Sequence, residues 1–145
     1  MDIKVFVYGT LMRDGVNKEI MKEIGAKFIT TGVIEAALYE IKNQDFPGVL
    51  LEKTGITVGE VFAIEENGLE VLDGEEGYNK NDLKNSCYTR SKIKVKGGDG
   101  QFYECYVYEI NPNKFTLGTL IISGDWKEYI KTNLVQKGVW PCSQP

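Results

Sequence analysis

One glutamate, Glu76, and the short segment Tyr8-Gly9-Thr10-Leu11 are the parts of this sequence best suited to chemistry. The chain contains no histidine, so it can form neither a Ser-His-Asp triad nor a Cys-His pair, and it offers no imidazole to a metal ion. Proton transfer at neutral pH then falls to a carboxylate, a lysine, a tyrosine or a thiol. A carboxylate base is therefore the leading candidate.

The segment Tyr8-Gly9-Thr10-Leu11 follows a predicted buried strand, Lys4 to Tyr8, and precedes a predicted helix. At such a connection successive backbone N–H groups can bind an anion, and Gly9 lets a ligand approach the main chain. The same pattern is also typical of an ordinary strand-to-helix connection. It lacks the Gly-x-x-x-x-Gly-Lys-Ser/Thr spacing of a phosphate loop, so a nucleotide is not indicated.

Glu76 follows a short predicted helix and precedes Gly77. Acidic residues near a helix end are usually solvated, and Asp73, Glu75 and Glu76 together are typical of a solvent-facing cluster. If Glu76 instead faces a cavity, loss of water would raise its pKa above the usual value of about 4.3, and the neighbouring charges would add to that effect. The residues alone leave both alternatives open.

Three further residues are candidates. Glu60 lies in an apolar strand as a rival carboxylate, and we expect it to point outward. Tyr88 and Arg90 lie two residues apart on a predicted strand and so share a face, where they could present a phenol and a guanidinium to one site. Arg90 could equally pair only with a surface acid.

Composition and charge narrow the class of partner. The chain has 145 residues, 42% hydrophobic and 26% charged, which fits one globular domain over 1–145. A net charge of -4 argues against nucleic acid, because nonspecific nucleic-acid binding depends on clustered Lys and Arg. Lys92, Lys94 and Lys96 alternate, as on the solvent face of a half-buried strand.

The cysteines and the chain's hydropathy bear on location. Cys87, Cys105 and Cys142 are odd in number and show no C-x-x-C spacing, which argues against a disulfide framework and a zinc site. The sequence has neither a signal-peptide core nor a run of about 20 apolar residues, so we expect a cytoplasmic protein with no membrane contact. The order of the tail from Trp140 to Pro145 is not predicted.

Hydrophobic periodicity and turn residues predict a β-rich α+β fold, an antiparallel sheet or a closed, mostly antiparallel β-barrel with peripheral helices. The clearest element is a hairpin around Gly97-Gly98-Asp99-Gly100. A corner is expected at Pro47-Gly48, followed by a pair of strands formed by 49–51 and 56–64. The predicted strands cover 4–8, 28–41 (long or broken), 49–51, 56–64, 88–96 and 102–110, and the predicted helices cover about 16–24, 66–72 and 123–130.

The order and spacing of several short motifs resemble the γ-glutamylcyclotransferase-like family, which includes the γ-glutamylamine cyclotransferases and the AIG2-like proteins. The resemblance spans nearly the whole chain. Its motifs are Tyr8-Gly9-Thr10-Leu11 with Gly15 and Asn17, Phe46-Pro47-Gly48, Gly59-Glu60-Val61, Leu72-Asp73 with Glu76-Gly77, Tyr88 with Arg90, and Ser123-Gly124-Asp125-Trp126.

The resemblance implies a small β-barrel with helices around it and a substrate cavity walled by the Tyr8-Gly9-Thr10-Leu11 segment. It also implies that Glu76 is the catalytic glutamate of the Leu-Asp-x-x-Glu-Gly motif, whereas Glu75 lies one position too early. We expect Tyr88 and Arg90 to contact substrate beside that segment.

The implied reaction releases 5-oxoproline from a small γ-glutamyl compound when the substrate's own α-amino group attacks its γ-carbonyl. It requires no enzyme nucleophile, cofactor or metal. The alternative is a non-catalytic AIG2-like module that binds a small molecule or serves a stress response, because a fold does not fix an activity. The sequence predicts neither the leaving group nor the oligomeric state.

Overall fold

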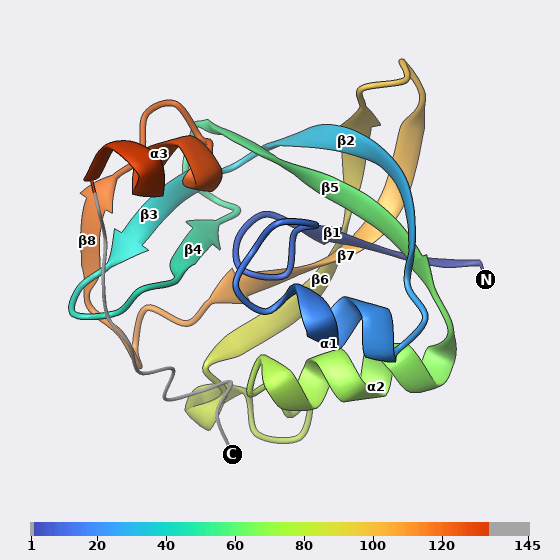
Figure 1. The fold of residues 1–145 in the computed structure, drawn as a ribbon. Helices are drawn as coiled ribbons and strands as arrows, with labels where there is room; N and C mark the ends of the chain where they lie inside the picture. Colours follow the sequence, from blue (N-terminus) through green and yellow to red (C-terminus); the bar gives the residue numbers. More distant parts are fainter. Residues whose placement is uncertain (1, 134–145) are drawn as a thin grey trace.

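A closed β-barrel with helices against it dominates the computed structural model, which describes residues 2–133 (Figure 1). The elements in chain order are β1 (Ile3–Val7), α1 (Lys18–Glu23), β2 (Lys27–Glu35), β3 (Ala37–Ile41), β4 (Pro47–Leu50), β5 (Ile56–Ile64), α2 (Glu66–Glu75), the 3-10 helix η1 (Leu83–Asn85), β6 (Tyr88–Gly97), β7 (Phe102–Ile110), β8 (Leu117–Leu120) and α3 (Trp126–Asn133). The tail from Trp140 to Pro145 and Cys142 lie outside the described residues.

The barrel strands follow the order β1-β5-β2-β6-β7, and β7 closes the barrel against β1. All neighbours are antiparallel except β1 and β7, whose parallel pairing places Val5 opposite Tyr106. The β6-β7 hairpin forms as its Gly-rich turn predicts. These findings confirm the predicted β-rich α+β class and the mostly antiparallel barrel.

A smaller sheet of order β4-β3-β8 lies beside the barrel, near α3 (Figure 1). The expected corner at Pro47-Gly48 is wrong, because these residues begin β4, where proline is tolerated on an edge strand. Gly48 is required there by β7, since a Cβ at Gly48 would lie 2.5 Å from the Cβ of Ile110. The expected pairing of 49–51 with 56–64 is also wrong: β4 pairs with β3, and β5 pairs with β1 and β2.

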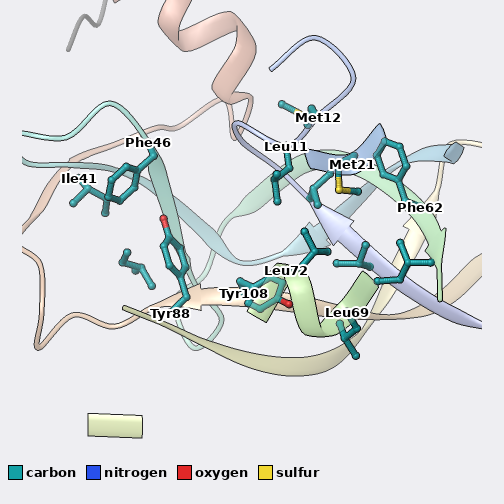
Figure 2. Close-up of a cluster of buried hydrophobic side chains, with 14 residues drawn as sticks. Leu11, Met12, Met21, Ile41, Phe46, Phe62, Leu69, Leu72, Tyr88 and Tyr108 are labelled. Carbon is teal, nitrogen blue, oxygen red and sulfur yellow. The ribbon is translucent and has the colours of Figure 1, made fainter. Parts of the chain in front are cut away.

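The strands bury opposite faces in two hydrophobic clusters. Val5 and Val7 of β1 belong to the cluster that also holds Leu69 and Leu72 of α2 (Figure 2). Phe6, between the two valines, belongs to the other cluster. Successive side chains of β1 thus point to opposite faces, as in a strand that is buried on both sides. The cluster on the Val5 and Val7 side packs α2 against the barrel.

The cysteines differ from expectation at one position. Cys105 is a buried free thiol, whereas Cys87 is disulfide-bonded, so the expectation of no disulfide is wrong for Cys87. Spacing within the sequence gave no signal for it because a disulfide depends on distance in space. None of the helices in residues 2–133 is long and apolar enough to span a membrane.

Candidate active site

A cavity at the end of β1 brings most of the predicted site residues together. Glu76 from the end of α2 and Tyr88 from the start of β6 both line it, together with the segment that follows β1. Arg90 does not line it. The lining residues are Phe6, Val7, Tyr8, Gly9, Thr10, Leu11, Phe46, Pro47, Glu76, Tyr88 and Tyr108.

The C-terminal cap of α2 positions Glu76. Glu76 is the capping residue, and Gly77 follows it with a φ of 64°, the left-handed conformation that favours glycine. The N–H of Gly77 donates to the carbonyl of Gly74 at 3.2 Å, and the N–H of Tyr78 donates to the carbonyl of Asp73 at 2.8 Å. These two bonds are those of a Schellman motif. The chain therefore reverses immediately after Glu76.

Among the described residues, the Glu76 carboxyl group lacks polar partners that would stabilise its charged form. It has no hydrogen-bond partner among residues 2–133 and is only partly exposed. Burial raises its pKa to about 8, and the charge of Glu75 contributes to the shift. Burial also raises the pKa of Tyr8, Tyr88 and Tyr108, and the Glu76 charge adds to each shift. A solvent-facing cluster does not describe these acids, because Glu76 faces a cavity.

The segment that follows β1 presents unused donors. The N–H groups of Gly9, Thr10 and Leu11 donate to no atom of the described residues. Two carbonyl groups of the segment are hydrogen-bonded. The N–H of Met12 donates to the carbonyl of Gly9 at 3.2 Å, and the N–H of Asn17 donates to the carbonyl of Thr10 at 2.9 Å. Consecutive free N–H groups at a cavity wall can bind an anion.

Glu60 holds the same segment in place. It is 4% exposed, so the expectation that it points outward is wrong. Its carboxylate accepts the backbone N–H of Arg13 at 2.8 Å and the Nε–H of Arg13 at 3.2 Å, which compensate its burial. The Arg13 guanidinium also lies 3.5 Å from the ring centroid of Phe28. Glu60 does not line the cavity, so it is not placed as a rival base.

Three tyrosines wall the cavity, and each commits its hydroxyl proton to the protein. Tyr8 donates to the carbonyl of Tyr108 at 2.7 Å, Tyr88 to the carbonyl of Pro47 at 2.8 Å, and Tyr108 to the carboxylate of Asp73 at 2.7 Å. A hydroxyl has one proton. Each of these tyrosine oxygens can therefore only accept a hydrogen bond from a ligand, not donate one.

Sequence reasoning missed Tyr108, although one signal points to it. The register of the predicted hairpin places Tyr108 directly opposite Arg90, and cross-strand partners share a face. Arg90 lies behind the cavity wall, where its Nη1 is 2.6 Å from a carboxylate oxygen of Asp73. Within residues 2–133, no three acidic or cysteine side chains gather closely enough to hold a metal ion.

Comparisons with known proteins show the family to which this chain belongs. The model of the family described as "Gamma-glutamyl cyclotransferase, AIG2-like" matches residues 5–128. The chain belongs to this family. A protein of Methanocaldococcus jannaschii named "Putative gamma-glutamylcyclotransferase" is 32% identical over 126 residues, which cover 86% of this chain and 96% of the relative. A Halalkalibacterium halodurans protein of the same name is 36% identical over 78 residues, covering 54% of this chain and 66% of the relative.

Solved structures share the fold of this γ-glutamyl cyclotransferase family member. An uncharacterized protein from Pyrococcus horikoshii matches with a TM-score of 0.64 at 22% identity, covering 91% of this chain and 96% of that one. The AIG2-like protein of mouse matches with a TM-score of 0.59 at 25% identity, covering 74% of this chain and 76% of that one. The resemblance seen in the sequence motifs is thus confirmed at the level of family and fold.

Proposed function

We propose that this protein is a γ-glutamyl cyclotransferase that releases 5-oxoproline and a free amine or amino acid from a γ-glutamyl compound, with Glu76 as general acid and base. The observation that carries the proposal is the position of the Glu76 carboxylate, which lacks a hydrogen-bond partner in the described chain and shares a cavity with the free N–H groups of Gly9, Thr10 and Leu11. Membership of the family supports the class of reaction.

The chemistry needs only a proton carrier and correct positioning. The substrate's α-amino nitrogen attacks its own γ-carbonyl carbon, so a new C–N bond closes the ring while the original amide C–N bond breaks. Glu76 takes the proton that the attacking nitrogen loses and returns it to the leaving nitrogen. Because the attack is intramolecular, holding the substrate in a folded conformation supplies much of the rate enhancement.

The raised pKa of Glu76 suits this role. With a pKa of about 8, Glu76 is a stronger base than an ordinary carboxylate, so it can take a proton from the substrate's α-ammonium group more readily. A substrate ammonium beside Glu76 would also stabilise its carboxylate form.

The donors of the Gly9 to Leu11 segment would bind the anionic part of the substrate. Either the α-carboxylate or the oxyanion that develops on the γ-carbonyl can accept from them. These N–H groups make no hydrogen bond to the described chain, so a ligand would break none on arrival. Such prepared donors cost little reorganisation during the reaction.

The test is the substitution Glu76→Gln, which keeps the size and polarity of the side chain but removes the acid. We expect it to abolish 5-oxoproline release from γ-glutamyl amides and peptides while folding and ligand binding persist. Glu75→Gln is the matched control and should retain nearly all turnover. Normal turnover by Glu76→Gln would exclude Glu76 from this role, and a wild-type protein that binds γ-glutamyl ligands without releasing 5-oxoproline would favour the binding-module alternative.

A further inference from the structure

Asp73 connects the helix that carries Glu76 to the strand that carries Tyr108. The Asp73 carboxylate accepts the hydroxyl proton of Tyr108 at 2.7 Å, and Arg90 Nη1 lies 2.9 Å and 2.6 Å from its two oxygens. Asp73 and Arg90 are mostly buried, with side-chain exposures of 23% and 19%. Arg90 stands opposite Tyr108 in the β6-β7 register. These three side chains therefore form one ordered group against the cavity wall.

This group fixes the direction of the Tyr108 hydroxyl. A bond from a hydroxyl to a charged carboxylate is stronger than one to a neutral acceptor, and the same carboxylate also accepts from Arg90 Nη1 at 2.6 Å. If the hydroxyl turned its proton toward the cavity, it would place an oxygen lone pair against the Asp73 carboxylate. Toward a ligand in the cavity that Tyr108 lines, its oxygen can therefore act only as a hydrogen-bond acceptor.

The polar groups of the cavity therefore fall into hydrogen-bond acceptors and hydrogen-bond donors. Tyr88 and Tyr108 offer acceptors, since both tyrosine protons are already donated to the protein, and Glu76 offers acceptors in its carboxylate form. The Gly9 to Leu11 segment offers free donors. Glu76 and Tyr108 line the same cavity, and the Glu76 charge contributes to the raised pKa of Tyr108 after the larger effects of burial and Asp73.

We propose that the Tyr108 hydroxyl oxygen accepts a hydrogen bond from the α-ammonium group of the ligand, and that Asp73 and Arg90 position it by holding its proton. The inference rests on the proposed function for the identity of the ligand, a molecule with a free α-amino group and a γ-acyl group. Tyr108 touches the ligand, whereas Asp73 and Arg90 act through Tyr108. The anionic end of the ligand lies at the donor side of the cavity.

The test compares equilibrium binding of L-glutamate and of glutarate, which differ only in the α-amino group. We expect the wild-type protein to prefer glutamate and Tyr108→Phe to reduce that preference about tenfold, the effect of one hydrogen bond to a charged group. The affinity for glutarate should stay unchanged. Tyr106→Phe is the matched control, because Tyr106 lies on the same face of β7 and does not line the cavity; it should keep the wild-type preference.

The positioning residues are tested with the same two ligands. Asp73→Asn should lower the preference, since an amide N–H can donate to the Tyr108 oxygen and occupy its lone pair. Arg90→Gln should lower it less, and Arg90→Lys should restore much of it by keeping a charge beside Asp73. A structural role alone would weaken both ligands equally.

The inference is overturned if Tyr108→Phe keeps the wild-type preference, if it weakens glutarate as much as glutamate, or if the wild-type protein shows no preference. Binding requires no turnover, so these outcomes are separate from those of the proposed reaction. A protein that fails to release 5-oxoproline but loses its preference for glutamate in Tyr108→Phe would contradict the proposed function and support this inference.

Discussion

Glu76 is one of three neighbouring acids, and residue type alone does not show which of them is the candidate base. The motif and the absence of histidine point to this acid from the sequence, yet Asp73, Glu75 and Glu76 have similar chemistry and lie within four positions. The structure separates them by environment: Asp73 accepts from Arg90 and Tyr108, while Glu76 faces the cavity without a partner in the described chain. Direction and burial, not residue type, distinguish the candidate base from its neighbours.

The raised pKa of Glu76 predicts a pH-dependent effect of Glu76→Gln on stability. Below about pH 4 the carboxyl is protonated in the folded and unfolded states. Between about pH 4 and the folded-state pKa of about 8, the unfolded state loses a proton that the folded state keeps. The contribution of Glu76 to the free energy of unfolding therefore falls as the pH rises. We therefore expect Glu76→Gln to gain thermal stability relative to wild type, more at pH 9 than at pH 5.

Thermal unfolding of wild type, Glu76→Gln and Glu75→Gln at the two pH values measures this effect. Each unit of pKa shift corresponds to about 1.4 kcal/mol, so the change between the two pH values should be resolved easily. Glu75→Gln should show a much smaller change. An equal offset for Glu76→Gln at pH 5 and pH 9 would mean that Glu76 titrates as an ordinary solvated acid.

At the scale of elements, the sequence predicted those helices and turns whose geometry is set by residues close together in the chain. The Gly-rich turn predicted the β6-β7 hairpin, and Asp125 begins α3 as an N-cap whose carboxylate accepts the N–H of Glu128 at 3.2 Å. Pro47 and Gly48 instead predicted a corner, because a proline-glycine pair is typical of a turn. Their place on an edge strand against Ile110 depends on β7, which lies far away in the sequence.

The cap of α2 gives a prediction at this scale. Gly77→Ala forces a side chain into a left-handed conformation, with a φ of 64°, and should cost about 1–2 kcal/mol. Because this turn directly follows Glu76, we also expect a clear loss of 5-oxoproline release. Gly77→Asn should lose less, since asparagine tolerates this conformation.

Gly74→Ala is the control for this substitution, because Gly74 lies in the last turn of α2, three residues before Gly77, and a Cβ there would meet nothing within 4 Å. Alanine is favoured over glycine inside a helix by roughly 0.5–1 kcal/mol, so this variant should be as stable as wild type or more so. Denaturant unfolding and turnover are measured for all three variants. Equal stability of Gly77→Ala and Gly74→Ala would show that the cap does not need glycine.

At the scale of the whole molecule, the barrel order explains why residues distant in sequence meet at the cavity. β5 lies between β1 and β2, so Glu60 stands opposite both Val7 and Thr31 in the register. From there it reaches Arg13, 47 residues away in the chain. The sequence predicted the strands and a closed, mostly antiparallel barrel, but not the parallel pairing of β1 with β7 that closes it, because that pairing has no local signal. Alternation alone then placed Glu60 on the solvent side.

This connection makes Glu60 a test of how the barrel supports the site. Glu60→Ala leaves the N–H and the guanidinium of Arg13 without their acceptor, and we expect a loss of about 1–3 kcal/mol in the free energy of unfolding. Faster hydrogen exchange at amides 9–13 and slower 5-oxoproline release should accompany it, because the donor segment is no longer held. Glu60→Gln keeps an oxygen that can accept the Arg13 N–H and should retain most of the stability and turnover. If Glu60→Gln abolished turnover in a folded protein while Glu76→Gln did not, the base would be Glu60, and the cavity beside β1 would not be the reaction site.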